Sequence, residues 1–251
     1  MRSEHRDIES DGHKYFRYTE LELKWIRFWM RFAGLSPIGR VCTRLAASVA
    51  HPHKARSRLA YMNSKGYFSA SSIIHHKDLH LGTKIFMDDR VVVFQRENGG
   101  SITIGDRVCI YRDTIIETGD GGSLTIGADS SIHPRCQINA YVSPICIGSE
   151  VMIGPNCALY SYDHGLADDK PIWNQPLQSK GCISIGDGAW LGFGVIILSG
   201  VKIGKGSAVG AGSVVTLDIP DGAIATGNPA RVIKNRKEIN AKDFSEKDIP
   251  R

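Results

Sequence analysis

The segment LYSYDHG, Leu159 to Gly165, holds a histidine at the point where an otherwise regular sequence pattern stops. His164 can accept a proton at neutral pH, because the unperturbed pKa of an imidazole is about 6.5. Such a group can act as a general base that removes the proton of an attacking hydroxyl. The alternative interpretation is that His164 only caps a turn. Asp163 is adjacent, but neighbouring side chains often point apart, so the group that orients His164 stays open.

The pattern that stops here is a period of six residues, with an aliphatic residue at every sixth position and gaps between sets. These positions are Leu81, Met87, Val93, Ile104, Ile110, Ile116, Ile126, Ile132, Ile138, Ile147, Ile153, Leu159, Ile185, Leu191, Ile197, Ile203, Val209 and Val215. All eighteen are aliphatic, whereas the 42% hydrophobic composition would give seven or eight. Glycine directly follows half of them, among them Gly127 and Gly204, and we expect it to ease the backbone at turns. A fixed short period of this kind predicts a β-solenoid.

The positions of the gaps predict three strands per turn of the solenoid. The gaps follow Val93, Ile116, Ile138 and Leu159, in each case after the third position of a set. Three short strands would therefore close a triangular coil, and all extra residues would leave at one corner. We expect about six coils between residues 76 and 234, stacked about 4.8 Å apart. The longest gap predicts an extended loop over residues 160–182, and long loops on rigid scaffolds are usually functional.

The last part of the repeat is close to the signature of one family. It reads ISIGDGAWLGFGVIILSGVKIGKGSAVGAGSVVTLDIPDGAIATGNPARVIK, residues 183–234. Because of this segment, residues 81–234 as a whole resemble the hexapeptide-repeat acyltransferases. The resemblance implies a left-handed parallel β-helix, a homotrimer, and acetyl-CoA as co-substrate with no metal. Within the family, YDHG and the following KPI…QP loop resemble O-acetyltransferases of galactosides, maltose and bacterial surface polysaccharides, so it implies direct acetyl transfer to a hydroxyl of a sugar or surface-glycan precursor.

The resemblance also implies where the donor binds. Family members carry the base on this loop, so His164 matches the catalytic histidine. In the family, coenzyme A lies in a groove between subunits, on turns and basic residues that correspond here to Trp190, Phe193, Ala211, Thr216, Leu217, Arg231 and Lys234. Phe193 stands where the family's sugar enzymes commonly have a small residue, and Leu217 stands where they frequently have Lys. At these two positions we therefore expect contacts through the backbone.

Further side chains are candidates for contact with the acceptor. Asn139 directly follows the third position of a lower coil, as Glu117 does, and should lie near the corner of His164. Its role is either contact with the acceptor or acyl group, or that of a turn residue. The aromatic candidates can stack on a sugar ring or pack the loop down. The candidate acceptor-binding residues are Asn139, Tyr141, Tyr162, Asp163 and Trp173.

Residues 1–75 form a predicted helical region with 13 Lys and Arg against 6 Asp and Glu, whereas the rest of the chain has 18 against 20. Within it, a helical stripe is formed by Leu21, Trp25, Phe28, Trp29 and Phe32. The stripe predicts either a cap on the end of the solenoid or peripheral membrane contact through residues 20–60. Nothing beyond the charge indicates nucleic acid, so we expect no such partner. Residues 1–18 are predicted to be disordered and residues 235–251 to form a polar tail.

The sequence also bears on location. No apolar run approaches the ~20 residues of a membrane span, and the start MRSEHRDIES lacks the apolar core of a signal peptide. The six cysteines show no CxxC spacing, and Cys136 and Cys157 occupy equivalent repeat positions, so we expect structural thiols. These features predict a cytoplasmic protein, at most peripheral at the inner face of the membrane.

Three other functions compete with O-acetyl transfer. Enzymes that N-acetylate amino sugars usually carry a nucleotide-binding α/β domain before the β-helix, for which residues 1–75 are too short and too helical. A zinc carbonic anhydrase on this solenoid needs three converging histidines, but His133 and His164 are not at matching phases and no histidine follows His164. A non-enzymatic trimeric scaffold is the third alternative, and an intact acetyl-CoA groove argues against it. The fold alone does not decide among these functions.

Overall fold

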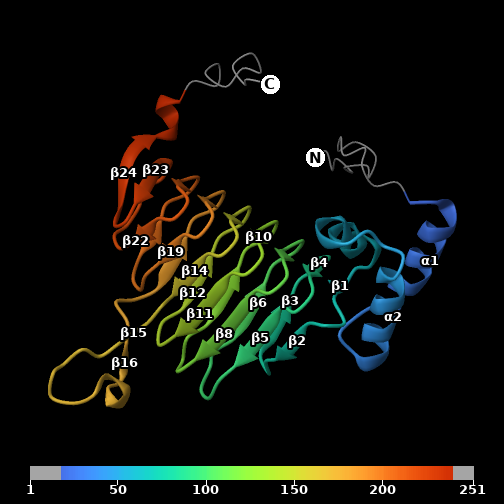
Figure 1. The fold of residues 1–251 in the computed structure, drawn as a ribbon, viewed down its shortest axis with the longest axis horizontal. Helices are drawn as coiled ribbons and strands as arrows, with labels where there is room; N and C mark the ends of the chain where they lie inside the picture. The colour runs from blue at the N-terminus through green and yellow to red at the C-terminus, as the bar shows by residue number, and fades with distance from the viewer. Residues whose placement is uncertain (1–17, 240–251) are drawn as a thin grey trace.

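The computed structural model describes residues 18–239 and shows a three-sided prism of short parallel strands with helices at one end (Figure 1). The segments before the prism are α1 (Glu20–Met30), α2 (Pro37–Ala47) and the 3₁₀ helix η1 (His53–Met62). The segments that follow it are the hairpin of β23 (Ala223–Gly227) and β24 (Ala230–Asn235), and η3 (Arg236–Glu238). The sequence predicts disorder over residues 1–18 and a polar tail over residues 235–251. Of these, residues 1–17 and 240–251 lie outside the described residues.

Each face of the prism is one sheet, called here sheet A, B or C. Sheet A contains β1 (Gly66–Phe68), β4 (Ile85–Met87), β7 (Cys109–Ile110), β10 (Ser131–Ile132), β13 (Met152–Ile153), β18 (Trp190–Leu191), β21 (Ala208–Val209), β23 and the antiparallel β24. Sheet B contains β2 (Ile73–His75), β5 (Val92–Gln95), β8 (Ile115–Gly119), β11 (Gln137–Tyr141), β14 (Ala158–Tyr160), β19 (Ile196–Ile197) and β22 (Val214–Val215). Sheet C contains β3 (Leu79–Leu81), β6 (Ile102–Ile104), β9 (Leu124–Ile126), β12 (Ile145–Ile147), β17 (Ile183–Ile185) and β20 (Lys202–Ile203). The chain visits A, B and C in turn through about seven coils, which confirms the predicted β-solenoid with three strands per coil.

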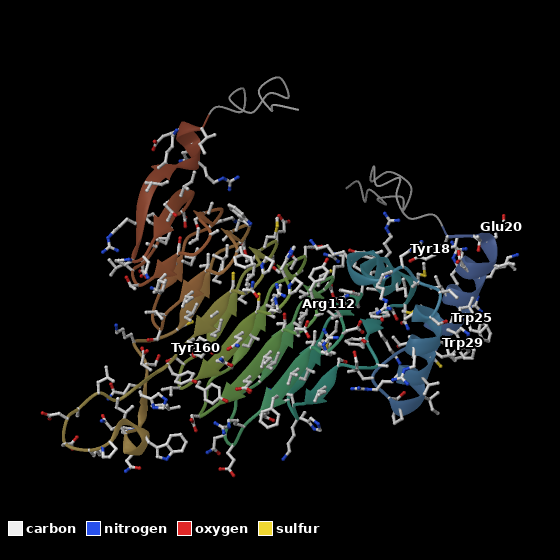
Figure 2. All side chains as sticks on the ribbon, in the orientation of Figure 1. Tyr18, Glu20, Trp25, Trp29, Arg112 and Tyr160 are labelled. Carbon is white, nitrogen blue, oxygen red and sulfur yellow. The ribbon has the colours of Figure 1, made fainter. Side chains whose placement is uncertain are left out.

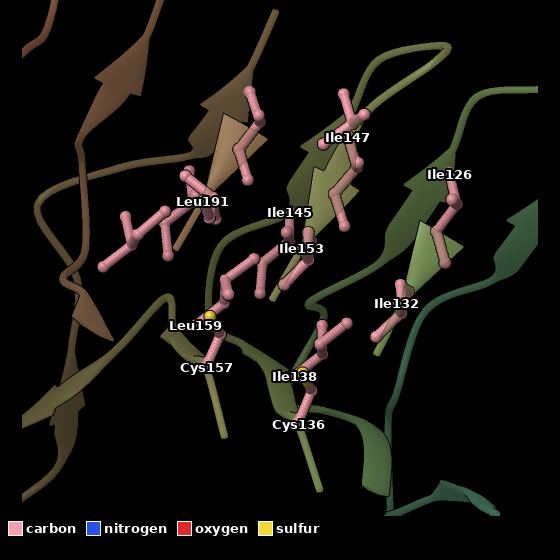
Figure 3. Packing of buried hydrophobic residues seen from close by; sticks show 14 of the residues in the cluster. Ile126, Ile132, Cys136, Ile138, Ile145, Ile147, Ile153, Cys157, Leu159 and Leu191 are labelled. Carbon is pink, nitrogen blue, oxygen red and sulfur yellow. The ribbon is translucent and has the colours of Figure 1, made fainter. Parts of the chain in front are cut away.

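The six-residue period arises because each strand turns one side chain of the period into the core. All eighteen predicted positions belong to one buried core, except Leu81, which is partly buried against it. Figure 3 shows Ile126, Ile132 and Ile138 of one coil converging on this interior from three faces. Each such side chain contributes about 1.5–3 kcal/mol when it leaves water, so the stacked coils hold one another together.

The solenoid begins one coil earlier than the sequence analysis predicts. β1 and β2 fall within residues 66–75, which were assigned to the helical region. Phe68 and Ile74 are their inward residues, since they pair with Met87 and Val93 of the next coil. An aromatic at the first position and a seven-residue step to Leu81 conceal this coil in the sequence, so the expected six coils become about seven.

The glycines that follow the inward positions serve close packing of the coils rather than the turn conformation that we expected. A Cβ on Gly127 would lie 2.4 Å from the backbone nitrogen of Ser149, and one on Gly204 would lie 2.3 Å from that of Asp221. The left-handed backbone of the turns falls two residues later, on Gly206 in a late coil. Glycine is therefore required because the next coil passes directly over it.

The helices cover the first coil, but of the predicted stripe only Trp29 packs against it. Ile26 and Met30 of α1 pack on Tyr67 and Phe86 of the first strands of sheet A. The members of the stripe that face solvent instead are Leu21, Trp25, Phe28 and Phe32. Figure 2 shows the labelled Trp25 on the outer side of α1. α1 is therefore apolar on two faces, and the more aromatic face is the exposed one. No helix within residues 18–239 is long and apolar enough to cross a bilayer.

Candidate active site

The interruptions of the repeat leave the prism at the corner between sheets B and C, as predicted. The longest one carries the hairpin of β15 (Asp163–His164) and β16 (Leu177–Gln178), and between them the short helix η2 (Ile172–Asn174). Figure 1 shows this loop projecting away from the prism. The antiparallel pairing of His164 with Leu177 fixes the backbone of the histidine at the root of the loop.

His164 presents an accessible imidazole at this root. Its side chain is exposed, and its ring meets the ring of Tyr162 edge-on, with centroids 6.4 Å apart and an interplanar angle of 70°. In the part of the chain that the structure describes, no hydrogen bond joins its ring nitrogens to another residue. Both nitrogens can therefore meet a ligand, as a general base requires.

Asp163 turns toward the next coil rather than toward His164. Its Oδ2 accepts a hydrogen bond of 3.1 Å from the hydroxyl of Ser199, which is almost fully buried. This bond ties β15 to the prism, so Asp163 acts on the position of the hairpin. The sequence analysis did not identify Ser199, although it stands two residues after an inward position, as Ser161 does one coil earlier.

Asn139 lies beside the histidine corner with an unsatisfied amide oxygen. It pairs with Glu117 on one side and Tyr160 on the other, so these three outward residues form a row across sheet B. Asn139 is 7% exposed, and within the described residues its Oδ1 has no hydrogen-bond partner. Such an orphaned acceptor costs about 1–3 kcal/mol unless a ligand or water supplies a donor. Because Asn139 lies inside β11, the alternative that it is a turn residue is wrong.

Three tyrosines connect this row to His164. Tyr141 is buried, and its hydroxyl donates to Oε2 of Glu117 at 3.1 Å. Burial and the nearby Glu117 raise the pKa of Tyr141 to about 12, so it stays a neutral donor. The Tyr162 ring lies 5.0 Å from that of Tyr141 and 5.9 Å from that of Tyr160, which Figure 2 labels where the loop leaves the prism. The structure therefore brings Asn139, Tyr141 and Tyr162 together next to His164.

Trp173 is separate from this group. It is 88% exposed and lies in η2, toward the end of the projecting loop. The loop itself is held by Gln175, which the sequence analysis missed and no repeat position could indicate. The Gln175 side chain accepts from the amide of Ala167 at 2.9 Å and donates to the carbonyls of Ala167 and Lys170 at 2.7 and 2.9 Å.

The predicted coenzyme A residues are all exposed, and they occupy several places on the last coils. They are Trp190 on sheet A, Phe193 and Ala211 in turns between sheets A and B, Thr216 and Leu217 between sheets B and C, and Arg231 and Lys234 in β24. Phe193 and Ala211 lie at the opposite edge of sheet B from His164, so one chain does not bring them together.

Metal and thiol chemistry have few candidates. Within residues 18–239, no group of three or more His, Cys, Asp or Glu is placed to hold a metal. Cys136 and Cys157 lie in the core, and their thiols donate to the carbonyls of Gly154 and Gly192 at 3.2 and 3.1 Å (Figure 3). These contacts are those of packing residues.

Comparison with known proteins agrees with this architecture. Residues 183–216 match the family described as bacterial transferase hexapeptide (six repeats). Residues 183–216 therefore carry the hexapeptide repeat of that family. It is 42% identical over 100 residues to a galactoside O-acetyltransferase of Lactococcus lactis, covering 40% of this chain and 46% of the relative. It is 40% identical over 103 residues to that of Escherichia coli, covering 39% and 46%.

The matched segments thus span less than half the length of these curated hexapeptide-repeat relatives. A crystal structure from Bacillus cereus, described as an acetyltransferase, superposes with a TM-score of 0.52 at 25% identity over 68% of this chain and 86% of that one. The prism is therefore the left-handed parallel β-helix that the resemblance implied.

Proposed function

We propose that this protein transfers an acetyl group from acetyl-CoA to a hydroxyl of a sugar or surface-glycan precursor, with His164 as general base. The observation that carries the proposal is the accessible imidazole of His164 at the loop root, together with the unpartnered amide oxygen of Asn139, which pairs with Tyr160 at the start of this loop. The similarity to galactoside O-acetyltransferases supports a hydroxyl acceptor. Fold alone would not, since one fold hosts several activities.

The reaction needs few groups. The acceptor hydroxyl gives its proton to an imidazole nitrogen of His164 while its oxygen attacks the thioester carbon. The carbon–sulfur bond then breaks, and the departing thiolate takes the proton back from the imidazolium. Asn139 Oδ1 orients the acceptor by accepting a hydrogen bond from a sugar hydroxyl. Direct transfer is part of this proposal, and the burial of the Cys136 and Cys157 thiols in the core supports it.

We infer that the working unit is a homotrimer with shared sites. Trp190, Phe193 and Leu217 are large side chains left exposed on the last coils of a single chain. A neighbouring copy would cover them and bring its own loop to this surface. Arg231 and Lys234 are exposed on β24 and suit the phosphates of coenzyme A.

His164→Ala tests the catalytic assignment. Turnover should fall by about 10²–10⁴-fold, the usual contribution of a general base, while coenzyme A binding persists. His80→Ala is the matched control, because His80 is exposed on sheet C and pairs with Asp78. Near-normal turnover in His164→Ala would falsify the assignment. Acetyl label found on amines of an amino-sugar panel, rather than on hydroxyls, would establish the N-acetyltransferase alternative.

Arg231→Ala tests the shared site. It should weaken coenzyme A binding, and mixing it with His164→Ala should regenerate some working sites if the two residues come from different chains. No recovery in mixed trimers would place the whole site within one chain. If the protein neither binds coenzyme A nor transfers acetyl, the non-enzymatic trimeric scaffold is the alternative that remains.

We further propose that the outer face of α1 and α2 binds an anionic membrane surface, which would hold the protein at the inner face of the membrane. Leu21 on α1 and Ile38 on α2 are 78% and 75% exposed, beside the outward aromatics of α1. Residues 18–62 carry eight Lys and Arg against two Glu, which favours anionic lipid over a second, equally basic copy.

Vesicle sedimentation tests this contact. Wild-type protein should sediment with phosphatidylglycerol vesicles and not with phosphatidylcholine vesicles, and Trp25→Ser with Phe28→Ser should abolish this binding. Trp173→Ser removes an exposed aromatic elsewhere and should not change it. Equal binding by the double variant, or none by the wild type, would refute the membrane contact.

A further inference from the structure

A hollow lies at the same corner of the prism as the active site, but several coils before it. His75, His76, Lys77, Phe94 and Gln95 line it, and its volume is about 440 Å³. The acetyl transfer described above makes no use of these residues. They belong to β2, β5 and the connection after β2, all on the sheet B side of the corner.

Strand register connects the hollow to the active site. His75 pairs with Phe94, Phe94 with Glu117, and the row continues through Asn139 to Tyr160. Each of these residues directly follows an inward-facing one, so all point outward from the prism, although Asn139 is covered by its neighbours. At about 4.8 Å per strand, Phe94 is about 14 Å from Tyr160 along the row. The hollow and the surroundings of His164 therefore lie on one line.

The floor of the hollow is held rigidly by hydrogen bonds. His76 Nδ1 accepts from the amide of Asp78 at 3.2 Å, so its Nε2 carries the proton and donates to the Thr118 hydroxyl at 3.0 Å. Burial lowers the pKa of His76, which keeps the ring neutral. Gln95 accepts from the amide of Lys77 at 3.1 Å. A preorganised floor reduces the entropy lost when a ligand binds.

Above this floor, Phe94 is 37% exposed, which leaves ring surface free for an apolar contact. Further along, the Glu117 carboxylate is oriented by Tyr141. Burial raises the pKa of both Tyr141 and Tyr162, and the charge of Arg96 opposes this rise in both. Along the row two polar residues, Glu117 and Asn139, lie between the aromatic Phe94 and Tyr160, which suits a polyhydroxyl chain.

We propose that the acceptor is a glycan of several sugar units that lies along this corner, with the acetylated unit at His164 and a more distant unit over Phe94 in the hollow. A single sugar would occupy only the surroundings of Asn139 and His164. From Asn139 the row continues about 10 Å to Phe94, where it reaches a separate hollow. The inference rests on the proposed acetyl transfer to a sugar hydroxyl and extends it to the length of the acceptor.

A glycan array from monosaccharides to long oligosaccharides, probed with full-length His164→Ala protein, tests binding without turnover. Retention should increase with chain length. Adding Phe94→Ala should lower the signal of the long glycans by about 3- to 10-fold, the usual contribution of an aromatic contact. Phe32→Ala removes an exposed ring just after α1, outside the hollow, and should leave the signals unchanged. Length-independent signals, signals unaffected by Phe94→Ala, or no retained glycan would each overturn the inference.

Turnover separates this inference from the proposed function. With wild-type protein and acetyl-CoA, kcat/KM should be higher for galacto-oligosaccharides than for methyl β-galactoside, and Phe94→Ala should reduce this ratio by about 3- to 10-fold. Acetylation of the monosaccharide with no gain for longer chains would overturn the extended site while the acetyl transfer stands. Retention of long glycans on the array without acetylation of any sugar would instead remove the proposed function.

Discussion

Gln175 holds the loop that follows His164, so Gln175→Ala is a direct test of what the loop does. The side chain is 7% exposed and makes three hydrogen bonds to the backbone of Ala167 and Lys170. Each such bond contributes about 0.5–1.5 kcal/mol net. Taking about 1 kcal/mol for each, the substitution should destabilise the closed loop by about 3 kcal/mol, which is roughly a hundredfold in the ratio of open to closed forms.

Hydrogen exchange measures this opening at one atom. The amide of Ala167 donates to Gln175, so its exchange should accelerate by roughly a hundredfold, while amides of β11 and β14 keep their protection. The melting temperature should change little, because the loop lies outside the stacked core. Turnover should fall, since the hairpin that carries His164 is anchored at the end of this loop.

Gln178→Ala is the matched control for this prediction. Gln178 is an exposed glutamine of the same hairpin, and its side chain makes no hydrogen bond within the described residues. It should leave both the exchange at Ala167 and the turnover unchanged. Unchanged exchange at Ala167 in Gln175→Ala would refute the reasoning about the loop. Faster exchange with normal turnover would show that loop order does not matter for catalysis.

Three other perturbations have defined outcomes. Ser199→Ala should lower kcat by no more than about tenfold with an unchanged KM for acetyl-CoA, since the lost bond to Asp163 only positions the hairpin; a complete loss of activity would show a direct catalytic role. Cys157→Ser should keep turnover within about threefold, because Ser213 occupies the equivalent buried position two coils later; inactivity together with a trapped acetyl thioester would refute direct transfer. Although burial opposes ionisation of Asp89, serine hydrogen bonds and the charge of Arg56 hold its pKa below the usual ~3.9, so its contribution to stability is complete above about pH 4 and is lost as the pH falls through the folded-state pKa. Melting curves of Asp89→Asn should therefore lose stability near neutral pH and show a weaker acid dependence than wild type; identical curves would refute this assignment.

The solenoid could be predicted because its sequence signal is local and repeated. Ile104, Ile110 and Ile116 each bury one side chain per strand, and the same requirement returns in every coil. The first coil escaped because Phe68 replaces the aliphatic residue at its first inward position. The helical stripe was correctly identified as apolar, but periodicity cannot tell which apolar face of α1 meets the protein, and the smaller face of Ile26 and Met30 does.

The site was predictable only where it follows the repeat. Asn139 and Glu117 could be placed at the corner from their phase, and the register places them side by side. The contact between Asp163 and Ser199, and the anchor of the loop at Gln175, depend on the path of irregular segments. Such segments lack a period, so no spacing in the sequence indicates which of their side chains meet.

The break of the period at His164 follows from the geometry of a repeating prism. From Leu81 onward every inward position of the six-residue period is aliphatic, and the outward residues and corner insertions are the ones that vary. The outward row at the edge of sheet B shows this variation, since Phe94, Glu117 and Asn139 occupy equivalent places on neighbouring strands yet differ in chemistry. The loop is such a corner insertion. A regular corner would end at the prism surface, whereas the hairpin carries His164 beyond it. The regular core fixes where each coil lies, and that rigidity allows one irregular corner to hold chemical groups in register with the row beside it.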